Sequence, residues 1–256
     1  MQTRLLVAAA AAIASGAAFA ADMPTTKAPP ALVPAPPFSW AGFYIGGNLG
    51  YGWGDADDRE VPAPNEPADS DFSIGVHPAG GLGGVQAGHN WQSGAFVVGA
   101  EADFDVAAIN RNARLNGLPI AGTGVIDPAW YATASEKLQS LGTLRLRAGV
   151  AVDRVLFYAT GGLAYGDVQY ASLTQYNGPA AEYVGSASAW EVGWTLGGGV
   201  EYALTDAWTI RGEYLYYDLG NQSYLAQPVA LNPPNIVRQT FSTNGQILRV
   251  GVNLRF

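Results

Sequence analysis

The chain contains no cysteine and few charged residues, and each shortage excludes a class of protein. Without cysteine it can form neither a disulfide scaffold nor a thiolate metal site. Charged residues make up 13% of the sequence, about half the share that is usual in soluble domains. The net charge of −8 offers no basic surface to phosphates, so we expect no nucleic-acid partner. The 33 glycines would each cost about 1 kcal/mol inside a helix, which disfavours a helical bundle.

Long apolar runs are also missing after the first twenty residues, so no transmembrane helix is expected. The beginning is typical of a secretory signal, because a positively charged start precedes the apolar run Leu5–Ala14 and small residues surround Phe19. We therefore predict a signal peptide over residues 1–20, cleaved after Ala20. Residues 21–39 contain six prolines, which favour an extended periplasmic arm, and residues 40–256 form the remaining domain.

From residue 40 onward, apolar and polar residues alternate with the period of two that defines β-strands. Near the end of the chain, for example, Leu248 and Val250 share one face and Arg249 lies on the other. The alternation predicts eight strands, Gly42–Trp53, Gly80–Trp91, Ala95–Val106, Leu141–Val152, Val155–Val168, Ala189–Leu204, Trp208–Asp218 and Gln246–Phe256. Each has about ten residues or more, which is the length that a tilted strand needs to cross a bilayer.

The connections between these strands alternate in length. Three are tight hairpin turns, at residues 92–94, 153–154 and 205–207. Four are long and polar or rich in proline, at residues 55–79, 107–140, 169–188 and 219–243. This arrangement predicts an all-β fold, an eight-stranded antiparallel transmembrane β-barrel with short periplasmic turns and long extracellular loops.

Aromatic residues lie on the apolar faces near both ends of the predicted strands, as in the girdles that meet lipid headgroups. One girdle is predicted near the short turns, from Trp91, Phe96, Tyr202, Trp208 and Phe256. The other is predicted near the long loops, from Tyr51, Trp53, Tyr165, Trp190 and Tyr216. We therefore expect the apolar faces to meet lipid. The 48% apolar content would then be divided between the signal peptide and this outer face, with no large internal core.

The polar faces carry charges that we expect to point into the lumen. They are Glu101, Asp103, Asp105, Arg145, Arg147, Glu191, Glu201, Arg211, Glu213, Arg249 and Arg255. An eight-stranded barrel is just wide enough for side chains to fill it, so carboxylates and guanidinium groups should pair inside. Two interpretations stay open, a salt-bridged plug or a narrow polar path for water and small ions. The plug is favoured, because charges in so narrow a lumen must be paired.

Four stretches of the sequence resemble a known family. Trp40–Trp53 (WAGFYIGGNLGYGW) resembles the opening strand of the small outer-membrane β-barrel proteins of alphaproteobacteria, often described as the porin family and similar to the OmpA transmembrane barrel. Gly84–Gln92, Thr160–Gly166 and Val250–Phe256 resemble the second, fifth and terminal strands of that family. His89 stands where the family pattern would place an aromatic residue such as Tyr.

The resemblance implies a location in the cell outer membrane and contacts with outer-membrane lipid and lipopolysaccharide. It also implies that Val252, Leu254 and Phe256 form the terminal signal read by the barrel-assembly machinery. The implied role is structural, contributing to envelope integrity and surface contacts, with a narrow passive channel for small solutes or ions as the alternative. We expect a monomer.

No pattern of residues indicates an enzyme. The chain has two histidines. His89 has no nucleophile beside it on its face of the strand, and His77 with Asp69 and Asp71 matches the Asp–His cluster of a barrel protease only faintly, so a solvated loop is favoured. No pair has metal-ligand spacing on one face. We therefore predict no catalytic site, no cofactor and no metal site.

Overall fold

The computed structural model describes residues 38–61, 72–120, 123, 125–176, 181–228 and 237–256. These residues belong to one compact unit, Pro37–Phe256. The predicted signal peptide (1–20) lies outside the described residues, as does the predicted arm (21–39) except for Phe38 and Ser39. Among the described residues, no helix is long and apolar enough to span a membrane.

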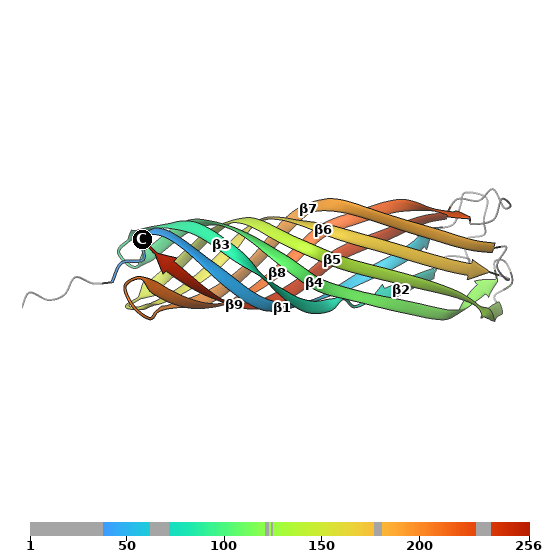
Figure 1. The fold of residues 1–256 in the computed structure, drawn as a ribbon, viewed down its shortest axis with the longest axis horizontal. Helices are drawn as coiled ribbons and strands as arrows, with labels where there is room; N and C mark the ends of the chain where they lie inside the picture. The colour runs from blue at the N-terminus through green and yellow to red at the C-terminus, as the bar shows by residue number, and fades with distance from the viewer. Residues whose placement is uncertain (1–37, 62–71, 121–122, 124, 177–180, 229–236) are drawn as a thin grey trace, which may run out of the picture. The chain divides into compact units, whose positions relative to one another are not determined.

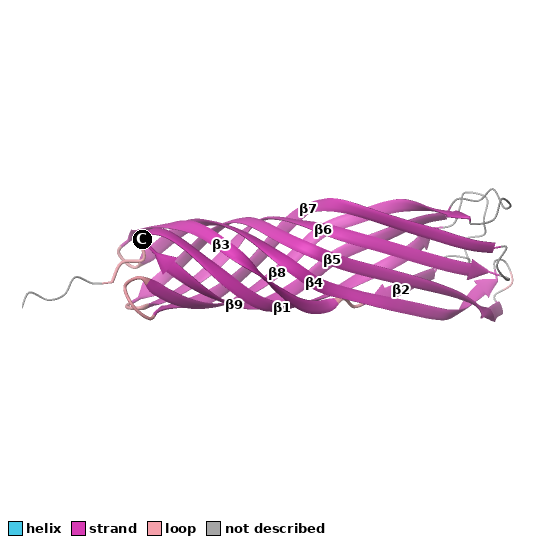
Figure 2. Ribbon diagram, in the orientation of Figure 1, coloured by secondary structure: helices cyan, strands magenta, loops and turns pink. Residues whose placement is uncertain are grey.

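The described residues form nine strands in a single antiparallel sheet (Figures 1 and 2). The strands are β1 (Gly42–Val61), β2 (Phe72–Val76), β3 (Ala79–Ser93), β4 (Phe96–Ile120), β5 (Val125–Val152), β6 (Val155–Tyr176), β7 (Ala181–Ala203), β8 (Trp208–Pro228) and β9 (Val237–Arg255). Eight of them follow one another around a ring, and β1 pairs with β9 to close it. The predicted eight-stranded antiparallel barrel is therefore confirmed, and β2 is a short addition that pairs with the far part of β1.

The boundaries predicted for the long connections were wrong, because the strands continue far into them. β4 runs on to Ile120 and β5 already begins at Val125, so most of the loop expected at residues 107–140 is strand. The other three expected loops are shortened in the same way. Polar outer residues such as Asn110 and Asn112 suggested loops, yet their backbone groups are still paired in the ladder between β4 and β5.

The three short turns lie where the sequence predicted them, between β3 and β4, β5 and β6, and β7 and β8. Two of them contain a left-handed residue, Gly94 with φ of 60° and Asp153 with φ of 51°. Both are residue types that tolerate this conformation. The chain ends beside the third turn, where the Arg255 amide donates to the Ala207 carbonyl at 2.8 Å. We call this end of the barrel the short-turn end, and the other the far end.

The outer wall carries the apolar side of the alternation over a band that begins at the short turns. Leu49, Leu146 and Val192 are exposed large hydrophobic residues in this band, which we call the lipid-facing band. The predicted girdle residues all lie on the outer wall. They are half-buried or exposed, at Tyr51, Trp53, Trp91, Phe96, Tyr165, Trp190, Tyr202, Trp208, Tyr216 and Phe256. On β4 the band ends at Val106, and the exposed residues that follow on this face include Asn110 and Asn112.

Candidate functional site: the interior of the barrel

Charged side chains fill the middle of the barrel and form one group of ion pairs, which we call the ion-pair layer. Its members are Glu101, Asp103, Asp105, Arg145, Arg147, Glu201, Arg211, Glu213 and Arg249. All nine are buried. The alternation of each strand brings them inside, because every second residue of a strand faces the same side of the sheet.

Glu101 on β4 lies at the centre of this layer. Its carboxylate is 2.5 Å from Arg145 Nη2 and accepts a second hydrogen bond from Arg211. Tyr44 on β1 donates its hydroxyl to the same carboxylate at 2.6 Å. Glu101 on β4 therefore links β1, β5 and β8. These links are strong, because hydrogen bonds to ionised groups are stronger than those between neutral groups.

Arg249 on β9 is the second centre. It lies 2.7 Å from Asp103, 3.1 Å from Asp105 and 2.6 Å from Glu213. Arg145 also contacts Glu213, at 3.1 Å. The layer thus contains five carboxylates and four guanidinium groups and comes close to neutrality, which is what the desolvation cost of buried charges requires.

Two residues that the sequence assigned to the same group lie apart from it. Arg255 is at the short-turn end, where it donates to the carbonyl oxygens of Ser39, at 2.5 Å, and Ala41, at 3.2 Å. Glu191 lies toward the far end and accepts a hydrogen bond from Tyr170. The sequence identified the inward face of each residue, but it did not show the height along the barrel at which each would lie.

An apolar cap closes the short-turn side of the ion-pair layer. Trp40 is fully buried and packs with Val97, Leu156 and Ala203 inside the barrel. Its backbone is held by Gln92, which accepts from the Trp40 amide at 2.5 Å. Sequence reasoning treated the predicted arm as ending here and missed this plugging role. The signal for it was a large aromatic residue just before the first strand.

An apolar core fills the barrel on the far side of the ion-pair layer, contrary to the expectation of no large internal core. It includes Ile74, Val76, Leu82, Ile109, Leu118, Leu138, Leu141, Val168, Tyr170, Leu215, Tyr217, Leu219, Phe241 and Ile247. The inner face changes from charged to apolar within a single strand, since the next residue after Glu213 on the inner face of β8 is Leu215. Beyond the lipid-facing band the outer wall carries polar residues such as Asn110, Asn112 and Lys137, and the apolar side of the alternation turns inward there as in a water-soluble barrel.

Glycines on the inner face give the large side chains room. A Cβ atom on Gly88 would collide with the Tyr44 hydroxyl, and one on Gly199 would lie 2.7 Å from the Tyr158 hydroxyl. Tyr158 in turn donates to Glu213 at 3.0 Å. The two tyrosines therefore reach the ion-pair layer because no side chain stands in their way.

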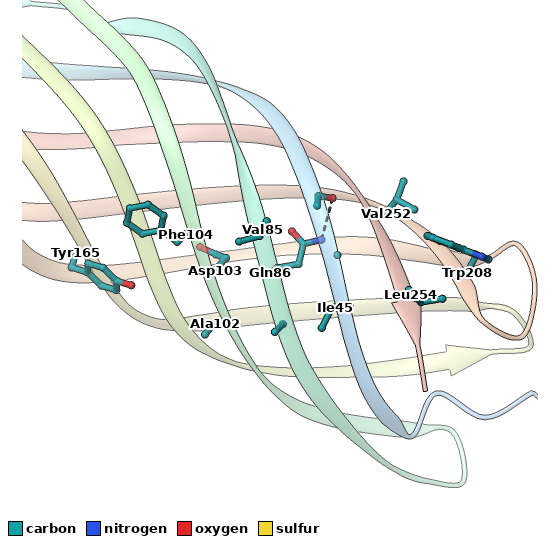
Figure 3. A pocket seen from close by; sticks show the side chains of 13 residues that line it. Ile45, Val85, Gln86, Ala102, Asp103, Phe104, Tyr165, Trp208, Val252 and Leu254 are labelled. Atoms are coloured by element: carbon teal, nitrogen blue, oxygen red, sulfur yellow. Dashed lines mark hydrogen bonds between the residues drawn. The ribbon is translucent and has the colours of Figure 1, made fainter.

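The outer wall has a groove of about 770 Å³, but its lining is apolar (Figure 3). Ile45, Val85 and Phe104 line it, and Trp208 and Leu254 flank it. The dashed line in Figure 3 is the hydrogen bond from Gln86 Nε2 to the Gly47 carbonyl, at 3.3 Å. Because this groove lies in the lipid-facing band, it can accommodate lipid chains, but it presents no groups that could react with them.

The histidine on the outer wall lies among aromatic rings. The ring centre of His89 is 4.3 Å from that of Phe43 and 4.4 Å from that of Trp91. Within the described part of the chain, no group of three or more His, Asp or Glu side chains could hold a metal ion.

Comparisons with known proteins agree with this geometry. The family model described as outer membrane protein beta-barrel domain matches residues 6–256, and the chain belongs to that family. A 31 kDa outer-membrane immunogenic protein of Brucella melitensis is 33% identical over 98% of this chain and 99% of its own length. A 25 kDa outer-membrane immunogenic protein of Brucella abortus is 30% identical over 100% of this chain and 99% of its own length. A 22 kDa outer membrane protein of Rhizobium leguminosarum is 31% identical over 74% of this chain and 69% of its own length.

Among solved structures, the outer membrane protease OmpT of Escherichia coli is similar in fold. It has a TM-score of 0.50 and 9% sequence identity, covering 84% of this chain and 97% of that one. At this identity the likeness concerns the barrel alone.

Proposed function

We propose that this chain is a structural protein of the outer membrane, which strengthens the envelope and neither conducts solutes nor catalyses a reaction. The observation that carries the proposal is the ion-pair layer, whose arginines are almost fully buried between the Trp40 cap and the apolar core. A conducting pore needs hydrated groups along its whole length, whereas these guanidinium groups touch carboxylates. The paired charges therefore favour a plug over a narrow polar path.

The short-turn end faces the periplasm in this proposal, and the far end faces the cell surface. That orientation follows from the barrel architecture of outer-membrane proteins, in which the short turns are periplasmic. Cleavage of the signal peptide after Ala20 would leave the proline-rich residues on the periplasmic side. The names of the Brucella relatives, outer-membrane immunogenic proteins, support exposure of the far end at the surface.

Contact with lipopolysaccharide is the second part of the proposal. A polar groove of about 600 Å³ lies on the outer wall, lined by small or amide side chains such as Asn110, Ser135 and Ser188, with Lys137 among them. Ser188 is two residues beyond Trp190 on the same face of β7, so the groove begins just past the aromatic girdle. Hydroxyl, amide and ammonium groups at this height suit the sugars and phosphates of the lipid headgroups.

The surroundings of His89 support the absence of catalysis. His89 packs between two aromatic rings on the lipid-facing wall. A nucleophile activated by a histidine would have to lie within hydrogen-bond reach of it. The neighbours of His89 on the same face of β3 are Ala87 and Trp91, and neither carries a nucleophile.

The structural and channel hypotheses predict opposite results when the gene for this protein is deleted. Loss of a structural barrel increases the entry of large apolar dyes and the sensitivity to detergent. Loss of a channel instead slows the uptake of small hydrophilic solutes and leaves the dye barrier intact. We expect the first result, with recovery when the gene is restored. Slower solute uptake with normal dye exclusion would contradict the proposal.

Assembly and oligomeric state complete the proposal. We expect the barrel-assembly machinery to read Val252, Leu254 and Phe256. Val252 and Phe256 are exposed and Leu254 is half-buried. Deletion of Phe256 should therefore slow membrane insertion in cells while purified protein still folds in detergent. The ring closes within one chain through β1 and β9, which is consistent with a monomer. Sedimentation in detergent tests this directly.

A further inference from the structure

Two buried glutamates in the apolar core have no counter-ion among the residues that the structure describes. Glu136 on β5 is 3% exposed and Glu191 on β7 is 6% exposed. The Oε2 atom of each is buried and has no hydrogen-bond partner. Among the described residues, neither carboxylate forms an ion pair with a lysine or an arginine. Such an arrangement is rare, because buried polar atoms are almost always satisfied.

Two hydroxyl groups link the glutamates in a chain of four oxygen atoms. Thr243 Oγ1 donates to Glu136 Oε1 at 3.1 Å, and Tyr170 Oη donates to Glu191 Oε1 at 2.9 Å. Between them, Tyr170 Oη and Thr243 Oγ1 are 2.5 Å apart, which is a hydrogen-bond distance. The chain therefore has three contacts and joins β5, β9, β6 and β7 across the inside of the barrel.

Counting protons shows that the chain needs one more than its hydroxyl groups supply. A tyrosine and a threonine each donate a single proton, and an ionised carboxylate donates none. The two hydroxyl protons can form only two of the three hydrogen bonds. If both are donated to the carboxylates, the oxygen atoms of Tyr170 and Thr243 face each other with no hydrogen atom between them. A third proton on a carboxyl oxygen satisfies all three contacts in one direction, from Glu136 through Thr243 and Tyr170 to Glu191.

We propose that Glu136 and Glu191 share one bound proton through Tyr170 and Thr243, and that this proton latches four strands of the barrel together at the far end. When the proton leaves to solvent, the contact between Tyr170 and Thr243 loses its hydrogen atom. Two negative carboxylates then remain in an apolar core. The far end of the barrel is tight when the site is protonated and loosens when it is not.

No cation among the described neighbouring groups offsets the charge of the pair, so the shared proton, which removes one of the two negative charges, is the means of reducing it. Tyr170 on β6 donates to Glu191, and Tyr217 on β8 lies close enough to interact with Glu136. Burial raises the pKa of Tyr170 well above its ordinary value, so it keeps its proton. β9 contributes Thr243 and Phe241, and β2 contributes apolar residues. On β4, Arg111 is the ladder partner of Glu136, but it is exposed and makes no ion pair with Glu136.

A β-bulge decides that the acidic residue, and not its basic neighbour, faces inward. The ladder between β5 and β6 shifts between Leu138 and Ser140. Buried positions on β5 are odd-numbered on one side of it, as at Leu141, and even-numbered on the other, as at Glu136. Lys137 consequently lies on the outer wall. Because Glu136 lies beyond the lipid-facing band, it can exchange protons with the medium around the far end.

Burial also raises the pKa of Glu136 to about 7, which agrees with a proton that is held at neutral pH. The strand pairing next to Glu191 shows where opening would begin. Ladder pairs between β7 and β8 are present at Val184 and from Trp194 onward, and the ladder is interrupted between them. Glu191 lies in this interrupted stretch, where β7 keeps its ladder with β6 but has no ladder pairs with β8.

Infrared spectroscopy tests the bound proton, using the whole mature chain folded in phosphatidylcholine vesicles in metal-free buffer. A protonated carboxyl group has a C=O stretch that an ionised one lacks. We expect one such band at about pH 6 that disappears by about pH 9, on either side of the raised pKa. Protein made with ¹³C-labelled glutamate must shift this band, which assigns it to glutamate without any substitution.

Two variants and a matched control complete the test. Glu136→Gln keeps the shape and still donates to Thr243, so it should fold and lose the band. Asp167→Asn, at a half-buried position outside the chain of oxygens, should leave the band unchanged. Tyr170→Phe interrupts the chain of oxygen atoms. We expect the carboxyl band of this variant to disappear at a pH at least about one unit below that of the wild type, which is a tenfold loss of proton affinity.

Three results would overturn the proposal. One is the absence of a glutamate band in the wild type at about pH 6. Another is a band that Tyr170→Phe leaves unmoved, since a merely buried acid needs no hydroxyl chain. The third is stoichiometric binding of Ca²⁺ that Glu136→Gln abolishes, because the glutamates would then hold a metal ion in place of a proton.

Discussion

Two ion pairs of equal length in opposite surroundings test whether the interior of the barrel is dry. Arg147 Nη2 and Glu201 Oε2 are 2.9 Å apart inside the ion-pair layer, and each side chain is 2% exposed. Arg154 Nη2 and Asp206 Oδ1 are also 2.9 Å apart, but these side chains lie at the short turns and are 43% and 88% exposed. Glu201→Gln and Asp206→Asn each remove one charge and keep the shape.

The expected losses differ several-fold. Removing one partner of a buried pair leaves an unpaired buried charge and costs about 3–5 kcal/mol. The loss in Glu201→Gln should lie at the low end of that range, because Arg147 still has the Glu101 carboxylate 3.8 Å away. The new Gln side chain can also still accept the hydrogen bond from Thr209. Asp206→Asn should cost about 0.5 kcal/mol or less, as exposed pairs do.

Urea unfolding in phosphatidylcholine vesicles, followed by tryptophan fluorescence, measures both free energies. Each titration is repeated at low and at high salt, because salt screens an exposed pair and hardly affects a buried one. We expect the loss in Glu201→Gln to be independent of salt. Losses below about 1 kcal/mol in both variants, or a strong salt dependence in Glu201→Gln, would refute a dry ion-pair layer.

Three further predictions address the cap, the core and the outer wall. Trp40→Ala should lower the free energy of unfolding by about 3–5 kcal/mol, because it empties a fully buried site, and a loss under about 1 kcal/mol in the same urea titration would argue against the cap. The raised pKa of Glu136, from 4.5 to about 7, means that the folded state binds this proton more tightly than the unfolded state. Stability should therefore fall by about 3 kcal/mol in total as the pH rises through that interval. Glu136→Gln should remove this fall, and equal pH dependence in both proteins would speak against it. Leu146→Arg, at a side chain that is 71% exposed in the lipid-facing band, should cost about 2–4 kcal/mol in vesicles, and a neutral result would show that Leu146 does not face lipid.

The sequence was sufficient for the ring of strands and for the face on which most side chains lie. Alternation alone puts Glu101 and Arg145 on the inner wall and Leu146 on the outer wall, because the strand period of two leaves no other choice. The outer band was equally readable, since its apolar run ends at aromatic residues on successive strands.

The inner layers were not readable, because they depend on how the strands are staggered against each other. Glu191 and Glu201 occur on the same face of β7, yet one joins the Tyr170 chain and the other joins Arg147. Their separation along β7 follows from the sequence, but the stagger that decides which residues of the other strands lie beside each of them is a property of the closed ring. Glu136 was hidden for another reason, since a bulge changes which residues of β5 face inward and the sequence around Gln139 carries no sign of it.

Conductance across a planar bilayer tests the closed interior most directly. Purified, folded protein is added to one side, with Glu201→Gln as a variant whose ion-pair layer is disturbed. We expect no steady conductance from the wild type at neutral pH, and at most brief openings from the variant. Steady channels of uniform size from the folded wild type would contradict it.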